Sequence, residues 1–487
     1  MKHLQILFLV LLSSLAFGQN DCDCERNYNE VYQKIRDNYA AYDMKVNAAT
    51  KPAFDALNKK IASKAKGVKD PKACFEILKE WTDFFKDNHL FINFQTSFSV
   101  ADSPEVVAAR ATKVLVQKHT SESSFERYLK DNQANLDPAE GVWESDDKEY
   151  RLGVIKDATN PKKLYGFLLT DRDKLWVKGK TKFELEKIGT DRYKTKYYYS
   201  DFSAEITLTR LVKNILAMDN IYKFTKVSPT PTEFVTLDEQ THALPDYRVE
   251  RIDSSTTLIV LPPFTIPNAP LYINELVSQN EKLILGAKNL IIDMRNNPGG
   301  DDNAFDALFP YIADGPIIRK GSKMRATQEN LILLNHELRS IQDFPQFKLT
   351  LEPKLRQIIR EMTLNMGTMI TAPDKEFNYK STDQMPKKVV VLVNKNTAST
   401  AESISLEAKQ SPKVIIMGRN TKGAADYTEV RDWGLPCFGW RLAIPLGISY
   451  RLPTQPMENV GIKPDVEIPE SEADWVSFTV KYLNTIK

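Results

Sequence analysis

From residue 256 onward, buried-type strands alternate with helical segments, and this alternation limits the fold more than any other feature. The apolar runs TTLIVLPPF, KNLIIDMRNN, KKVVVLVN and PKVIIMG begin at residues 256, 288, 387 and 412. Helical patterns follow several of these runs. Strands separated by helices pair in parallel through crossover connections. The sequence therefore predicts an α/β core over residues 250–487, with a helical insertion near 325–370.

The residues before this core show different patterns of apolar and polar residues. Residues 19–90 show apolar positions at helical spacing and predict an N-terminal helical domain that ends in Asp-Asn-His. Residues 91–140 are interpreted as a helical connector. Residues 141–232 contain short alternating runs separated by Gly, Asp, Asn and Pro, which is typical of an antiparallel β-rich module with one solvated face. The fold class is thus α/β multidomain.

The N-terminus predicts export. Residues 1–18 read MKHLQILFLVLLSSLAFG, a short basic start followed by an apolar run and a small-x-small cleavage pattern. We expect a signal peptide cleaved near Gly18-Gln19, with a periplasmic or secreted mature protein and no membrane span. The net charge is only +2 and no basic cluster interleaves with aromatic residues, which argues against a nucleic-acid partner.

The sequence has 4 cysteines, at positions 22, 24, 74 and 437. An exported protein can form disulfides, and either Cys22 or Cys24 bridging to Cys74 would join the N-terminal helices. A metal site at the Cys-x-Cys pair is the alternative, although no histidine or second cysteine pair lies nearby in the sequence.

Ser399 stands where a predicted strand turns into a predicted helix. The first amides of a helix lack intrahelical acceptors, and the helix dipole favours negative charge there, so a developing oxyanion is stabilised at such a turn. The competing interpretation is that Thr397 or Ser399 only caps the helix. An earlier strand ends in Asn297-Pro298-Gly299-Gly300, where backbone amides are open to a ligand because no side chain covers them.

Together these segments resemble a known family. The order NNPGG, TAS-x-A-E, G-x-x-T-x-G and E-x-x-G-I-x-P-D resembles the C-terminal-processing (tail-specific) peptidase family of serine proteases, over about 255–470. The resemblance implies a ClpP/crotonase-like core and a peptide or unfolded protein substrate, with no metal or cofactor. It assigns the nucleophile to Ser399 and the oxyanion hole to the amide of Thr400 with that of Gly299 or Gly300.

The family uses two kinds of general base, and the sequence favours the histidine kind. In the serine–lysine type the lysine directly follows T-x-G, but Thr421 and Gly423 align Ala424 with that position. Lys422 is one residue away from it. The tricorn-core type takes a histidine from the end of the helical domain, before a strand, and His89 has this context. The other histidines of the mature chain, His119, His242 and His336, do not.

The resemblance also implies an orienting group for the histidine. Glu458 matches the glutamate that serves this purpose before G-x-x-P-D, acting through a polar residue beside the histidine. Asn88 stands where relatives have a serine, and Asp87 is a competing orienting group. Glu402 is interpreted as a structural first-turn carboxylate that complements the helix dipole.

Residues 141–232 lack an evident PDZ-type carboxylate-binding loop, so specificity for a substrate C-terminus is not expected. Aromatic residues of this module, such as Trp143, Trp176 and Tyr197 to Tyr199, are interpreted as packing rather than as a binding face. Three hypotheses remain: a serine endopeptidase using Ser399, His89 and Glu458; an inactive relative that binds peptides in the same cleft; and a glycan-binding or scaffold protein. The oligomeric state is not predicted.

Overall fold

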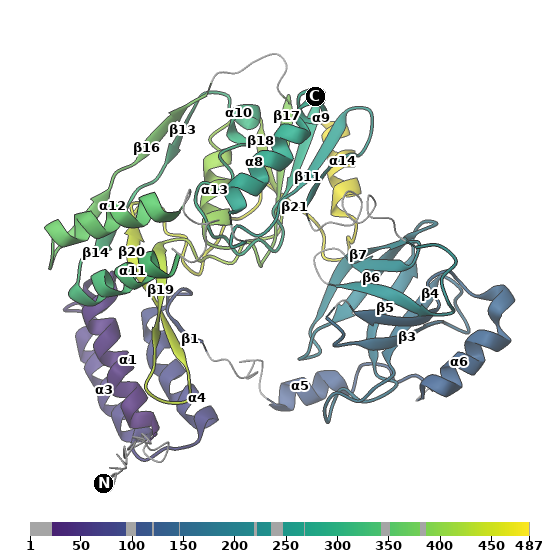
Figure 1. Cartoon of the computed structure of the whole chain (residues 1–487), viewed down its shortest axis with the longest axis horizontal. Helices are drawn as coiled ribbons and strands as arrows, with labels where there is room; N and C mark the ends of the chain where they lie inside the picture. The colour runs from purple at the N-terminus through teal and green to yellow at the C-terminus, as the bar shows by residue number, and fades with distance from the viewer. Residues whose placement is uncertain are drawn as a thin grey trace, which may run out of the picture. The chain divides into compact units, whose positions relative to one another are not determined.

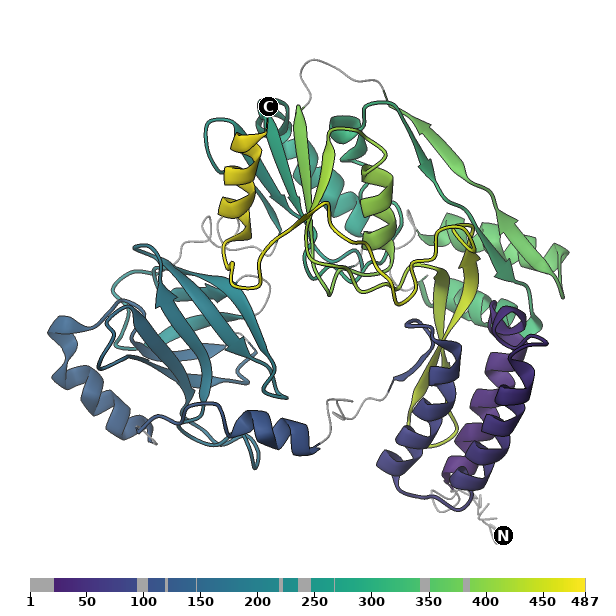
Figure 2. The ribbon, with the colours of Figure 1, turned by 180° about the vertical axis from the view of Figure 1, so that it is seen from behind.

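The computed structural model describes residues 22–93, 104–118, 121–145, 147–218, 222–234, 247–266, 268–341, 351–379 and 386–486. These residues divide into two compact units, which Figures 1 and 2 show from opposite sides. The first unit holds residues 22–93 together with 429–447, and the second holds the remainder. The predicted signal peptide, His119 and His242 lie outside the described residues. No helix within the described ranges combines the length and apolarity that a bilayer span requires.

The first unit is built from amphipathic helices. These helices are α1 (Cys24–Asn38), α2 (Tyr42–Lys45), α3 (Lys51–Ala65) and α4 (Pro71–Thr82), followed by the 3-10 turn η2 (Asp83–Phe85). Asp23 and Asp70 cap α1 and α4 by accepting backbone amides of the first turn. Trp81, Phe54 and Phe85 are fully buried between the helices, with ring centroids 5.3–5.9 Å apart. The predicted helical domain is confirmed.

A hairpin from the C-terminal half completes this unit. Strand β1 (Phe91–Asn93) pairs antiparallel with β20 (Arg441–Ser449), with Phe91 opposite Ala443. Strand β19 (Tyr427–Gly434) pairs with β20 to form the hairpin. The amide of Ala40 also donates to the carbonyl of Pro445, at 3.2 Å. This long-range pairing could not be predicted from the sequence, because a three-residue strand such as β1 has no periodicity to detect.

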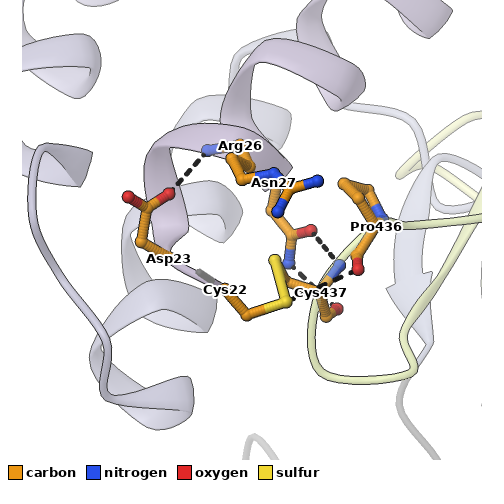
Figure 3. The surroundings of a disulfide bond; sticks show 6 residues. All are labelled: Cys22, Asp23, Arg26, Asn27, Pro436 and Cys437. Carbon is orange, nitrogen blue, oxygen red and sulfur yellow. Dashed lines mark hydrogen bonds between the residues drawn. A yellow bond between two sulfur atoms is a disulfide. The ribbon is translucent and has the colours of Figure 1, made fainter. Parts of the chain in front are cut away.

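Both pairs of cysteines form disulfides within the first unit. The Cys24–Cys74 bridge joins α1 to α4, as predicted, and excludes a Cys-x-Cys metal site. A second bridge, Cys22–Cys437, closes a separation of 415 residues and ties α1 to the hairpin (Figure 3). Beside it the buried Asn27 side chain accepts from the Cys437 amide at 2.9 Å and donates to the Cys437 carbonyl at 3.2 Å. The sequence did not predict this bridge.

The β-rich module of the second unit is a closed antiparallel barrel. Its strands are β2 (Gly141–Ser145), β3 (Arg151–Lys156), β4 (Lys163–Leu168), β5 (Thr181–Lys187), β6 (Arg192–Tyr198), β7 (Ala204–Val212), β8 (Ile215–Met218) and β9 (Lys223–Ser228). Strand β9 pairs with β2, so the described barrel has no open edge. Trp143, Tyr197 and Trp176 are buried in its core, which supports their interpretation as packing residues. Helices α5 (Pro104–Ala111) and α6 (Glu122–Asp131) precede the barrel in the chain.

The core of the second unit is a six-stranded sheet in the order β10-β11-β12-β17-β18-β21. The antiparallel edge strand β10 (Arg248–Arg251) precedes five parallel strands: β11 (Thr256–Val260), β12 (Asn289–Asp293), β17 (Lys388–Val393), β18 (Val414–Gly418) and β21 (Val466–Glu467). Strands β11, β12 and β17 are almost completely buried, which explains their continuous apolar sequences. The predicted parallel α/β core is confirmed.

Helices cover both faces of this sheet (Figures 1 and 2). Helices α8 (Ala269–Gln279), α10 (Phe309–Ile312) and α13 (Thr400–Ala408) pack on one face, where Ile273, Phe309 and Ile404 contact the strand residues. Helix α14 (Trp475–Thr485) packs on the other through Trp475 and Leu483. Helix α9 (Glu281–Leu285) follows α8. This three-layer arrangement fixes the ends of the strands, where the candidate site lies.

The insertion between β12 and β17 has its own small core. Two ribbons, β13 (Pro316–Arg319) with β16 (Lys375–Asn378) and β14 (Ser322–Arg325) with β15 (Met369–Ala372), lead to the helices α11 (Gln328–Ser340) and α12 (Leu351–Leu364). Apolar side chains of both helices form a separate buried cluster. The insertion is therefore partly strand, whereas the sequence suggested helix.

Breaking the Cys22–Cys437 bridge should destabilise the first unit. The double variant Cys22→Ser, Cys437→Ser should lose about 2–5 kcal/mol of unfolding free energy, because the bridge restricts a very long loop of the unfolded chain. Thermal denaturation monitored by circular dichroism measures this loss. An unchanged midpoint, with the bridge confirmed in the parent by non-reducing peptide mapping, would contradict the expectation.

The buried Lys182 should make the stability of the barrel depend on pH. Its ammonium donates to the carbonyl of Tyr198 at 2.6 Å and lies 4.5–4.8 Å from the rings of Tyr150, Trp176 and Tyr197. Burial lowers the pKa of Lys182 to about 7 from an ordinary 10.5. The folded chain then binds fewer protons than the unfolded chain above this pKa, so the free energy of unfolding should rise with pH.

The Lys182→Met variant should remove that rise. Urea denaturation followed by tryptophan fluorescence at several pH values between about 7 and 9 compares the two proteins. Parent stability should increase across this window, whereas the variant should change less. Equal slopes in the two proteins would show that Lys182 does not titrate there.

Candidate active site

The segments singled out in the sequence meet at one edge of the central sheet. Strands β12, β17 and β18 are parallel neighbours, so their carboxyl ends lie side by side. The Asn-Pro-Gly-Gly turn follows β12, the Ser399 turn follows β17, and the Thr421 loop follows β18. In an open parallel sheet this edge is where ligands bind.

Ser399 has a strained backbone at the end of the strand–helix turn. Its φ is 55° and its ψ is −125°, a conformation that side-chain-bearing residues rarely adopt. Serine nucleophiles of hydrolases stand on turns of this kind, where the hydroxyl is presented above a sheet. Ser399 is at the N-cap position of α13, so the capping interpretation describes its place correctly. A cap alone, however, requires only ordinary extended backbone.

The Glu402 carboxylate holds this turn in place. Glu402 is completely buried and accepts from the Ser399 amide at 3.0 Å. It also accepts from the Thr421 hydroxyl at 2.5 Å and from the amides of Gly423 and Ala424 at 2.8 Å each. These bonds agree with the expected structural role of Glu402, and they extend it beyond an interaction with the helix dipole. One carboxylate links the nucleophile turn to the loop after β18.

The glycines after β12 are required by space and by backbone conformation. Gly299 has φ +91°, and a Cβ atom there would lie 2.7 Å from the amide nitrogen of Thr400. Gly300 has φ +136°, and a Cβ atom there would lie 2.1 Å from the carbonyl carbon of Phe264. Real Cβ atoms do not approach so closely, so the turn packs against the Ser399 segment only with glycine at position 299 and against the chain at Phe264 only with glycine at position 300.

The backbone amides around Ser399 differ in what they bind. The Gly299 amide donates to the buried Asn297 side chain at 3.0 Å. Within the described part of the chain, the Gly300 amide has no acceptor. Thr400 is the first residue of α13, so its amide precedes the first intrahelical acceptor. The amides of Gly300 and Thr400 thus have no acceptor among the described residues, and their role as oxyanion donors stays a prediction.

The position of a catalytic lysine is occupied by alanine. Ala424 is buried, with its amide on Glu402, and offers no titratable side chain. The Lys422 amide donates to the carbonyl of Thr397 at 3.0 Å, while the lysine side chain is exposed to solvent. This geometry agrees with the expectation that Lys422 does not serve as the base.

Glu458 lies in a turn that a buried aspartate anchors. The Asp426 carboxylate accepts from the amides of Met457 and Glu458, at 2.7 and 2.8 Å. Asp426 is completely buried and the Glu458 side chain is half-buried. Asp426 could not be singled out from the sequence, because a single aspartate before a strand carries no distinguishing pattern.

Arg451 is a second residue that was not predicted from the sequence, and it is buried at the edge of this site. Its guanidinium donates to the Ser403 hydroxyl at 3.1 Å and to the carbonyl of Ala425. Burial lowers the pKa of Arg451. Arg451 thus links α13, one helical turn after Ser399, to the loop that contains Ala424.

His89 belongs to the first unit, where it stands between η2 and β1. It is therefore separated by one residue from the start of a strand, in agreement with the sequence context. Its amide donates to the Asp87 carboxylate at 2.8 Å, and the Tyr39 hydroxyl donates to the same carboxylate at 2.7 Å. Burial raises the pKa of Asp87 to about 6. Asp87 thus fixes the backbone of His89.

The pairing of His89 with Ser399 and Glu458 joins the two units and stays a prediction. The other described histidine, His336, has an exposed side chain on helix α11. Asn88 is half-buried beside His89.

Residues 256–468 match peptidase family S41. The core of this chain is a peptidase family S41 domain. The predicted membership of a C-terminal-processing peptidase family is confirmed. The matched residues include the glycine turn, Ser399 and Glu458, and they exclude His89 and the N-terminal helices before it. A search of curated proteins found no match.

Several solved structures resemble the S41 chain at low sequence identity. Mature CPAF complexed with lactacystin has 11% identity and a TM-score of 0.48, covering 95% of this chain and 97% of that chain. The photosystem II D1 C-terminal processing protease has 13% identity and a TM-score of 0.35, with 92% and 94% coverage. The tricorn protease has 13% identity and a TM-score of 0.41, covering 95% of this chain and 36% of that chain.

Removing the charge of Glu402 should loosen the nucleophile turn. In Glu402→Gln, the amide nitrogen would face backbone donors, so we expect a loss of about 2–3 kcal/mol in unfolding free energy. Labelling of Ser399 by a fluorophosphonate should also become slower. The matched control is Glu275→Gln on the exposed side of α8. Equal stability and labelling in the two variants would contradict the role of Glu402.

Proposed function

We propose that this S41 chain is an exported serine endopeptidase that hydrolyses peptide bonds through an acyl-enzyme on Ser399. The observation that carries the proposal is the strained Ser399 turn, which stands beside two backbone amides suited to an oxyanion. Two disulfides in the described chain are consistent with the oxidising compartment that export would provide.

The proposed reaction has two halves. The Ser399 Oγ atom attacks the peptide carbonyl while the His89 imidazole takes its proton, and the amides of Gly300 and Thr400 bind the resulting oxyanion. The C–N bond then breaks, and the imidazolium gives its proton to the leaving amine. Water, deprotonated by the same imidazole, hydrolyses the acyl-enzyme and restores Ser399.

The choice of His89 as base rests on the loop after β18. Ala424 has no ionisable group and Lys422 is exposed, so the serine–lysine solution lacks a base in this chain. A neutral imidazole has the pKa range needed to accept and return a proton near neutral pH. Glu458 is proposed to orient His89, with Asn88 as the polar residue between them.

The substrate class is peptides or unfolded proteins. The barrel of residues 141–228 gives no reason to expect recognition of a substrate C-terminus, so we propose internal cleavage. No nucleic-acid partner is proposed.

One observation favours a second function. Because alanine replaces the lysine, the chain could instead be an inactive relative that binds peptides in the same cleft. The two functions differ in whether Ser399 reacts: an endopeptidase forms a covalent adduct with a fluorophosphonate, whereas a binding protein does not.

The deciding experiment combines that probe with casein cleavage. Ser399→Ala should abolish labelling and lower cleavage by at least about 10³-fold, and His89→Ala should cost nearly as much. Lys422→Ala should stay within about threefold of the parent. A strong loss in Lys422→Ala would overturn the histidine assignment, and a parent protein that neither labels nor cleaves would favour the peptide-binding alternative.

A further inference from the structure

We propose that the hydroxyl of Thr400 is a positioning group that holds the two oxyanion-binding amides of Gly300 and Thr400 in register. The inference rests on the proposed peptidase function. The proposed reaction uses only the backbone amide of Thr400. The inference adds that the Thr400 side chain also affects the reaction rate.

The Thr400 side chain contacts the glycine turn directly. Its Oγ1 atom donates to the carbonyl of Gly300 at 2.9 Å, across a separation of 100 residues. The residue is only 9% exposed, so water competes little for this bond. The hydroxyl therefore joins the first turn of α13 to the residue that supplies the other candidate oxyanion donor.

Gly300 needs such a contact because glycine does not fix its own backbone. Glycine occupies more of φ,ψ space than other residues, and its amide direction is correspondingly free. The neighbouring Asp301 amide donates to the carbonyl of Phe264 at 3.0 Å, which holds the chain on one side. The Thr400 hydroxyl holds the Gly300 carbonyl, which belongs to the same peptide plane as the Asp301 amide. Asn297 holds the amide of Gly299. The peptide plane that carries the Gly300 amide therefore lies between two held planes, and this restricts its direction.

Precise placement matters because an oxyanion hole works by preorganisation. Its donors must already point at the position where negative charge develops, since reorienting them during the reaction adds to the barrier. Small misplacements in an active site can cost about 100-fold in rate. A hydroxyl that ties one donor segment to the other reduces this misplacement without contacting the substrate.

Asp302 is a second acceptor for the same hydroxyl, with its Oδ1 atom at 3.1 Å. A hydroxyl has one proton, so the two acceptors share or compete for it. Asp302 is exposed and its other oxygen lies 3.5 Å from Lys354 of α12, a contact that solvent weakens. We assign the functional bond to the Gly300 carbonyl because that bond is shorter and joins both oxyanion donors.

The test compares two substitutions at position 400. Thr400→Val keeps the amide and the shape but removes the hydroxyl, and kcat should fall about tenfold to a hundredfold with KM within about twofold. Thr400→Ser keeps the hydroxyl and should recover kcat to within about threefold of the parent. The matched control is Thr363→Val on the exposed face of α12, which makes the same chemical change away from the site.

A pair of inhibitors distinguishes a specific loss of oxyanion binding from a general disturbance of the active site. A peptide aldehyde forms an oxyanion on binding to Ser399, whereas the corresponding alcohol does not. Thr400→Val should weaken aldehyde binding about as much as it lowers kcat and leave alcohol binding unchanged. Equal loss for both inhibitors, or no loss of kcat, would overturn the inference.

Two further results keep the inference distinct from the proposed function. A loss in Asp302→Ala as large as that in Thr400→Val would overturn the assignment to the Gly300 carbonyl. If the parent protein itself fails to react with the fluorophosphonate, the proposed function fails instead. If the parent reacts and Thr400→Val matches it in kcat, only the inference fails.

Discussion

The geometry of the candidate site depends on the buried carboxylate of Glu402. It accepts hydrogen bonds from the Ser399 amide, the Thr421 hydroxyl and the amides of Gly423 and Ala424. A buried charge is tolerated only when such donors surround it. The strained Ser399 backbone can persist because the Glu402 carboxylate binds its amide. The same carboxylate also binds the loop after β18 and so holds that loop in place.

The position of the glycine turn depends on its contacts with the N-terminal end of α13. Gly299 allows the chain after β12 to approach the Ser399 segment more closely than any side chain would permit, and Gly300 allows the same close approach to Phe264. Close approach alone leaves the turn flexible, and the Asn297 side chain and the Thr400 hydroxyl each bind it at one point. Rigidity of the site therefore comes from side chains that bind backbone, rather than from residues that would touch a substrate.

The α/β core could be predicted because fully buried parallel strands are continuous apolar runs and because helices follow β11, β12 and β17. The nucleophile turn and the glycine turn were also visible, since their short motifs require particular residue types. The Cys22–Cys437 bridge, the pairing of β1 with β20, and the roles of Asp426 and Arg451 could not be predicted. Each depends on a contact between residues far apart in the chain, which no local pattern encodes.

The sequence by itself determined the parallel core, the position of Ser399 at a strand–helix turn, and the absence of a lysine at position 424. Only the tertiary structure decided that Glu402 accepts hydrogen bonds from two separate segments, in addition to placing a negative charge in the first turn of α13. It also decided that the Gly299 amide is bound by Asn297 whereas the Gly300 amide lacks an acceptor in the described chain. The physical reason is that residue types restrict the local backbone conformation, whereas the hydrogen-bond partners of a residue are set by the packing of distant segments.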